Sequence, residues 1–195
     1  MDGGLTLSLG RCSFRFIGGS TMAFSLYQAS VPVFTQILTG LSGVLDKAAA
    51  YVQEKKIDPA ALLNDRLFSN MFPLIRQVQV AADWAKNCSA RLAGVEPPQF
   101  ANDEKSFEDL KARIAKTLDF VKGLDAAAID AAVEKEIVFP AGAEKRKMAG
   151  ADFLLHQTLP HFFFHVTTAY DILRTNGIDL VKRDFMGPVP RVTTL

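Results

Sequence analysis

All three histidines of the sequence fall within residues 156–165, which read HQTLPHFFFH. His161 and His165 are four residues apart, so on a helix they lie on the same face. Two imidazoles at this spacing can bind one metal ion. The same pair also occurs as the hydrogen-bonded edge of an aromatic-rich core, and the spacing alone leaves both interpretations open. His156 is about half a circle from His165 on the helical wheel, unless Pro160 kinks the helix.

The other reactive residue types form no complete catalytic motif. Cys12 and Cys88 are the two cysteines, and we expect free thiols in a reducing compartment, hence a cytoplasmic protein. Lys86 is the cation nearest to Cys88 in sequence, but residues two apart on a helix do not face each other. We therefore interpret Cys88 as a small buried side chain and not as a nucleophile. The sequence contains no phosphate-binding glycine loop and no Gly-x-Ser-x-Gly elbow.

Composition excludes several classes of partner. The 195 residues carry 22 Lys and Arg against 21 Asp and Glu, a formal charge of +1, so we expect no nucleic-acid partner. No uncharged apolar run approaches the ~20 residues of a membrane helix, so we expect no membrane partner. Hydrophobic residues make up 49% of the chain. This fraction, together with the aromatic run Phe162–Phe164, predicts a homodimer that covers exposed apolar surface.

Four segments with a period near 3.6 residues must position the histidines and their surroundings. They span about 25–55, 71–93, 106–122 and 151–175, and a β-hairpin is expected near 136–148. The fold class predicted is an all-α, up-and-down four-helix bundle with a small hairpin before the last main helix. We expect Asn70 to cap the second helix, Ser106 and Asp109 to form a capping box, and Gly40 and Gly43 to allow close approach of another helix.

The domain is expected to span residues 22–187. Residues 1–21, rich in glycine, are interpreted as an extension outside the packed domain, and 188–195 as a loose tail.

Two stretches resemble the signatures of a largely bacterial family known only as a domain of unknown function, DUF1993. They are HFFFHVTTAYDILRTNG followed by GIDLVKRDFMG, and MFPLIRQVQVAADWAKNCSARLAG. The similarity extends over residues 23–187. This family resembles the DinB/YfiT superfamily, which implies a four-helix bundle related to metal-dependent enzymes, among them thiol transferases.

The resemblance also implies a metal site that is degenerate here. DinB-type proteins bind a divalent metal through three histidines, two of them in an HxxxH motif upstream of a Leu-Arg pair. His161 and His165, upstream of Leu173-Arg174, match that motif, but the stretch 76–84, where the third would lie, contains no histidine. An amide oxygen is a weak ligand for zinc-like ions, so at most weak binding of zinc or nickel is expected.

The sequence therefore predicts a hydrogen-bonded polar pocket in which His161 and His165 face the second helix near Gln79 and Asp83. The candidate pocket residues are Gln77, Gln79, Asp83, Trp84, His161, His165 and Tyr170. Three functions remain open: a small-molecule binding or stress-related protein with a degenerate metal site, a divalent-metal-dependent thiol transferase or hydrolase-like enzyme, and a structural or oligomerising module.

Overall fold

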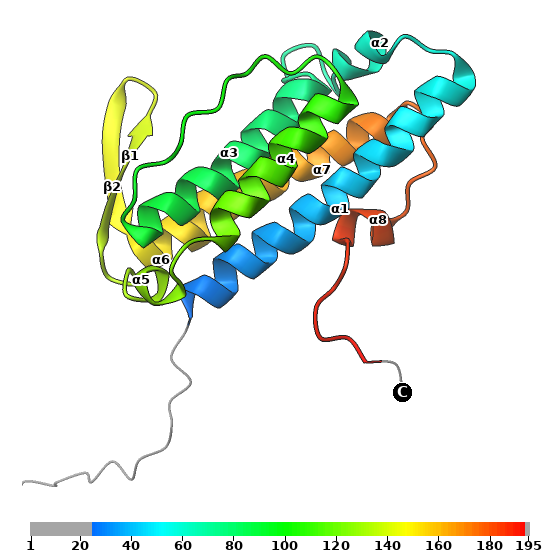
Figure 1. Ribbon diagram of the computed structural model, residues 1–195. Coiled ribbons are helices and arrows are strands. Elements are labelled where there is room, and N and C mark those ends of the chain that lie inside the picture. Colours follow the sequence, from blue (N-terminus) through cyan, green and yellow to red (C-terminus); the bar gives the residue numbers. More distant parts are fainter. Residues whose placement is uncertain (1–24, 194–195) are drawn as a thin grey trace, which may run out of the picture.

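A computed structural model describes residues 25–193. Four long helices lie side by side and enclose the apolar core, as Figure 1 shows. They are α1 (Leu26–Lys55), α3 (Leu74–Ala93), α4 (Phe107–Lys122) and α7 (Leu159–Thr175). Four short helices lie between or beside them: α2 (Pro59–Leu63), α5 (Ala126–Asp130), α6 (Gly150–Asp152) and α8 (Lys182–Met186). The predicted four-helix bundle is confirmed.

Local sequence signals account for the ends of these helices. The Ser25 hydroxyl accepts from the Gln28 amide at the start of α1. Ser106 and Asp109 form the expected capping box of α4, which satisfies amides that have no partner inside the helix. Gly94 ends α3 with a φ of 75°, a left-handed conformation that glycine adopts without steric cost.

The start of α3 differs from the sequence expectation. The helix begins at Leu74 and not near Met71, and Pro73 occupies the cap position without any side-chain hydrogen bond. Proline disfavours helical geometry in the residue before it, so Phe72 cannot be part of the helix, and the Asn70 cap expected from the sequence does not form.

The order of the bundle also corrects the up-and-down prediction. In Figure 1, α3 and α4 run in the same direction, and the connection between them returns along the length of the bundle. An extended chain spans about 3.3 Å per residue, whereas a helix rises about 1.5 Å per residue. Residues 94–106 are therefore long enough to cover the full length of α4, which makes the parallel arrangement possible.

The predicted hairpin forms at one end of the bundle from β1 (Glu136–Ala141) and β2 (Glu144–Ala149), paired antiparallel. Ile137 and Phe139 alternate with exposed neighbours and are buried, so one face of β1 packs on the helices. After α6, residues Phe153–Thr158 form one π-helical turn before α7 begins. The last helical segment is therefore interrupted just before Pro160, where the sequence indicated a kink or a start.

One of the two glycines in α1 allows a close approach. A Cβ at Gly40 would lie 2.8 Å from the carbonyl oxygen of Phe185 and 3.0 Å from the amide nitrogen of Gly187, so α8 packs directly on the α1 backbone there. Gly43 has no such neighbour within 4 Å.

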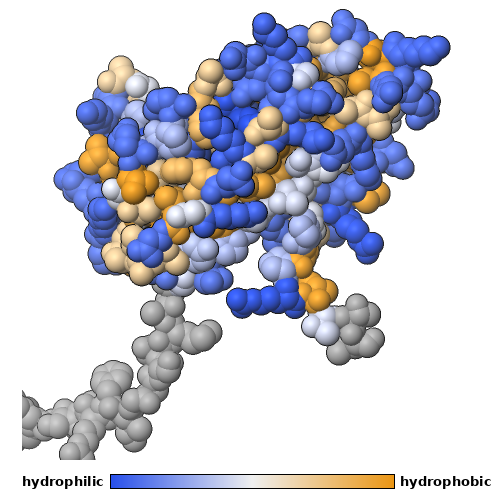
Figure 2. Space-filling model, viewed as in Figure 1, coloured by the Kyte–Doolittle hydropathy of each residue, from blue (hydrophilic) through white to orange (hydrophobic). Residues whose placement is uncertain are grey.

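Hydrophilic residues cover most of the face seen in Figure 2, as expected for amphipathic helices around one core. Within residues 25–193, no helix is both long and apolar enough to span a membrane. The extension expected at 1–21 lies outside the described residues. In the segment expected to be a loose tail, Val189 and Val192 are 43% and 73% exposed.

Candidate functional site

The histidine pair projects from α7 toward α3, where it joins a column of flat rings. The His161 ring stacks on the Trp84 indole with centroids 4.4 Å apart and an angle of 15° between the planes. The ring centroids of His161 and His165 are 6.5 Å apart, and those of His165 and Phe72 are 6.4 Å apart, again nearly parallel. The antiparallel packing of α3 and α7 thus places four rings in sequence along the contact between the two helices.

Gln77 determines which ring nitrogen of His165 carries the hydrogen. The Gln77 side chain donates from Nε2 to the carbonyl oxygen of Phe72 at 3.0 Å, so its Oε1 is the atom that faces the imidazole. His165 Nδ1 lies 2.7 Å from that Oε1 and must carry the hydrogen. The lone pair of neutral His165 is therefore on Nε2.

The environment of His165 favours the neutral ring. Its side chain is 7% exposed. Burial lowers its pKa to about 4, and electrostatic interactions with His161 and Arg76 act in the same direction. His165 is thus a neutral hydrogen-bond acceptor at Nε2 near pH 7.

Gln79 and Asp83 lie on a different side of α3 and are not brought to the histidine pair. Gln79 donates to Glu104 Oε2 at 2.7 Å. Asp83 Oδ1 accepts from Arg113 of α4 at 2.9 Å and lies 3.2 Å from the Lys86 ammonium. Arg113 also bonds Glu104 at 2.7 Å, so these residues form a largely buried network that holds the α3–α4 connection against the bundle.

Tyr170, another candidate from the sequence, lies near α8. Its hydroxyl is 3.4 Å from the carbonyl oxygen of Leu180, and its ring contacts Phe185. Of the seven candidate residues, the structure therefore brings four together: Gln77, Trp84, His161 and His165.

These residues do not fit a metal centre with three protein ligands. The two imidazoles are the only strong ligands in this group, because Gln77 Oε1 already accepts from His165 and an amide oxygen is a weak ligand for zinc-like ions. The Asp83 carboxylate is bound by Arg113 and Lys86 on another side of α3. Within residues 25–193, no group of three or more His, Cys, Asp or Glu residues is arranged to hold a metal ion. Catalytic zinc sites commonly use three protein ligands, so the donor set is incomplete.

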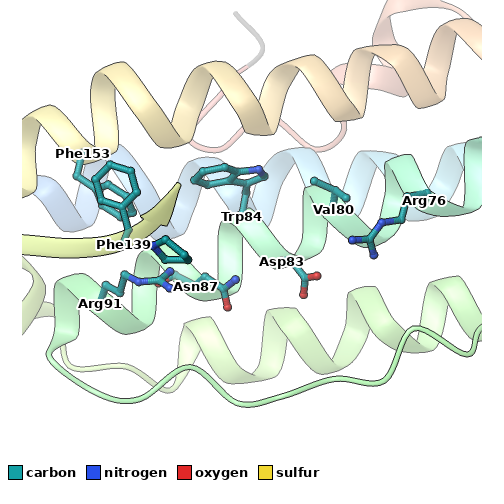
Figure 3. A pocket seen from close by; sticks show the side chains of 9 residues that line it. Arg76, Val80, Asp83, Trp84, Asn87, Arg91, Phe139 and Phe153 are labelled. Atoms are coloured by element: carbon teal, nitrogen blue, oxygen red, sulfur yellow. The ribbon is translucent and has the colours of Figure 1, made fainter. Parts of the chain in front are cut away.

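Beside the ring column lies a groove with a volume of about 230 Å³, shown in Figure 3. We call it the α3 groove. One stripe of α3 forms its floor, and β1 and the π-helical turn close one end. Its lining residues are Arg76, Val80, Asp83, Trp84, Asn87, Arg91, Phe139, Pro140 and Phe153. Trp84 is shared, since its indole lines the groove and also stacks on His161.

Asp83 and Trp84 were predicted from the sequence as pocket residues, and the remaining lining residues were not. A usable signal was present on α3, because Arg76, Val80, Trp84, Asn87 and Arg91 follow one another at steps of four, four, three and four. Such steps mark one helical face. No local pattern indicated that the hairpin and the π-helical turn would close the end of that face.

Cys88 does not contribute a nucleophile to this region. Its side chain is fully buried, and burial raises the pKa of the thiol to about 12. This agrees with the interpretation of Cys88 as a core residue.

The four-helix bundle with a hairpin before its last long helix is a DinB-like fold. Residues 26–186 match the family described as "Domain of unknown function (DUF1993)", and the chain belongs to that family. It is also similar to the crystal structure of a DinB family member protein from Shewanella denitrificans, with 37% identity and a TM-score of 0.80. That match covers 87% of this chain and 96% of the other. A comparison with curated proteins finds no match.

Proposed function

We propose that this protein binds a small molecule in the α3 groove, and that its histidine pair is the remnant of a metal site. The observation that carries the proposal is the position of Trp84, which stacks on His161 and lines the groove at the same time. A ring held in this way is a preorganised surface for a flat ligand.

The lining has the composition of a ligand site. Phe139, Phe153 and Val80 supply apolar surface, and Asn87 and Arg91 supply a few polar groups that can orient a ligand. Drug-sized ligands occupy pockets of ~300–1,000 Å³. The volume of about 230 Å³ therefore favours a ligand smaller than these.

The chain's single tryptophan allows a direct test. N-phenyl-1-naphthylamine, an uncharged fluorescent probe, is titrated into the protein while energy transfer from Trp84 to the probe is followed. We expect saturable binding, and loss of binding in Val80→Phe, which fills the groove. Val138→Phe is the matched control, because Val138 lies on the exposed face of β1. Equal binding by wild type and Val80→Phe would contradict the proposal.

The alternative of a divalent-metal-dependent enzyme requires a ligand set that the described residues do not supply. Metal analysis of tag-free protein, repeated on the double variant His161→Ala/His165→Ala, separates the two. The proposal expects substoichiometric zinc or nickel in both proteins. Stoichiometric zinc that survives dialysis against a chelator and disappears in the double variant would favour the enzyme.

The third candidate, an oligomerising module, is supported by exposed aromatic rings around His165. Phe72 and Phe164 are 51% and 54% exposed, and both rings contact the His165 imidazole. Surface of this kind is often covered by a second subunit. Light scattering at micromolar concentration should show a dimer that dissociates in Phe164→Ser, and a monomeric wild type would refute it.

A further inference from the structure

Arg91, like Arg76, is a cation of α3 that forms no ion pair among residues 25–193. It is half-buried at the end of the α3 groove that the hairpin closes (Figure 3). Its Nη1 donates to the carbonyl oxygen of Asn87 at 3.3 Å. Among residues 25–193, no carboxylate oxygen lies within 4.0 Å of its guanidinium nitrogens, and Glu96 acts on it only at longer range.

Of the other two cations on this helix, Lys86 is paired with a carboxylate, whereas Arg76 has only neutral partners. Lys86 lies 3.2 Å from Asp83 and donates to the carbonyl oxygen of Pro98 at 2.6 Å. Arg76 donates to Gln79 and lies over the Phe72 ring. A partly desolvated charge without a counterion is costly, so an external anion can stabilise either arginine, and the surroundings of the two decide between them.

The net charge of the groove lining is positive, like that of Arg91. Asp83 is the one acidic residue of the lining, and its charge is neutralised by ion pairs with Arg113 and Lys86. Arg76 and Arg91 remain, at opposite ends of the stripe, about 22 Å apart along the helix at 1.5 Å per residue. A small ligand can therefore reach only one of them, and only Arg91 lies beside the apolar end formed by Phe139 and Phe153.

Resting on the function proposed above, we infer that the ligand is a small organic anion with a flat apolar body. Its carboxylate, sulfonate or phosphate group binds the Arg91 guanidinium and the side-chain amide of Asn87, one helical turn away. Its apolar body lies against Trp84 and the two phenylalanines of the hairpin end. The positive charge of Arg91 and the aromatic surface beside it therefore favour the same class of ligand.

Two probes with one ring system test the anion separately from the groove. 8-Anilinonaphthalene-1-sulfonate differs from N-phenyl-1-naphthylamine by its sulfonate. We expect the sulfonate to bind wild type roughly tenfold more tightly than the uncharged probe, the size of one charge-assisted hydrogen bond. Arg91→Gln should remove this preference, measured as the ratio of the two probe affinities, while Arg91→Lys should restore part of it. Arg146→Gln, an exposed arginine of β2, is the matched control.

The outcomes distinguish the two proposals. Equal affinity of wild type for both probes would overturn the anion site and leave the groove proposal intact, whereas binding of neither probe would overturn both. Loss of the preference in Arg76→Gln instead of Arg91→Gln would overturn the assignment to Arg91. Displacement of the sulfonate probe by benzoate, but not by equal inorganic phosphate, supports the flat body, and equal displacement by the two would refute it.

Discussion

The protonation of His165 should make the stability of this protein depend on pH between about 4 and 6.5. An unperturbed histidine has a pKa near 6.5. In the folded protein, burial lowers the pKa of His165 to about 4, assisted by electrostatic interactions with His161 and Arg76. Between these two values the unfolded chain binds a proton that the folded protein does not. Stability is therefore fully present above about pH 6.5 and falls as the pH decreases toward 4.

The size of the effect follows from the two pKa values. Lowering the pH from 7 to 5 protonates nearly all unfolded chains at this position and very few folded ones, which removes about 2 kcal/mol of unfolding free energy. For a protein of this size, that corresponds to a fall in melting temperature of roughly 4–8 °C. Carboxylates also titrate at low pH, so a reference that lacks the imidazole is needed.

His165→Gln provides that reference. Urea unfolding of wild type and variant is measured at pH 7, 6 and 5, and the stability advantage of wild type should shrink by about 2 kcal/mol over this range. NMR titration of the imidazole C–H resonances, assigned with the same variant, gives the pKa directly. Parallel stability curves for the two proteins, or a His165 midpoint near 6.5, would refute the reasoning.

Three further predictions concern packing and charge. Arg113→Met leaves the carboxylates of Asp83 and Glu104 without their shared cation and should cost about 3–5 kcal/mol in urea unfolding; a loss under about 1 kcal/mol would contradict the network. Gly40→Ala should destabilise by roughly 1–3 kcal/mol, because the new methyl meets the α8 backbone, whereas Gly43→Ala should stabilise by up to about 1 kcal/mol; equal thermal shifts would argue against this contact. In a Cys12→Ser background, Cys88 should react with Ellman's reagent only after denaturation, since burial raises its pKa to about 12, and stoichiometric labelling of the native protein would oppose this.

Helix positions were predictable because each long helix carries its own apolar stripe and its own end signals. Ser106 with Asp109, and Gly94, act at their own positions and need no knowledge of the rest of the chain. The direction of α4 was not predictable in this way. It depends on whether the 94–106 connection turns at once or runs the length of the bundle. Arg113 holds this connection through Ala101 and Glu104 and also binds Asp83, 30 residues earlier in the sequence.

The candidate site shows a similar limit. Gln77 and Gln79 differ by about 200° on the helical wheel, so only one of them can face the histidines. Sequence periodicity gives this angle but not the neighbour on either side, and α3 contacts both α4 and α7. Gln79 pairs with Glu104, which leaves Gln77 to orient His165. Gln77 and Gln79 are both polar and lie on opposite sides of α3. From the sequence alone, either one was therefore a reasonable partner for the histidines.

The π-helical turn changes the angle between Phe153 and His161 around the helix axis. A regular helical wheel centred on His161 therefore does not predict that Phe153 closes the end of the α3 groove. In an unbroken α-helix, Phe153 and His161 would differ by about 80° around the axis, at 100° per residue. Pro160 has no amide hydrogen, and its ring crowds the carbonyl four residues earlier. The preceding turn is wider, and the Leu159 amide bonds to the carbonyl of Leu154, five residues back. One extra residue in the turn reduces the angle to about 20°, which brings Phe153 to the side of α7 that faces Trp84. The same proline that obscures the helical pattern thus places the aromatic end of the groove beside the histidine pair.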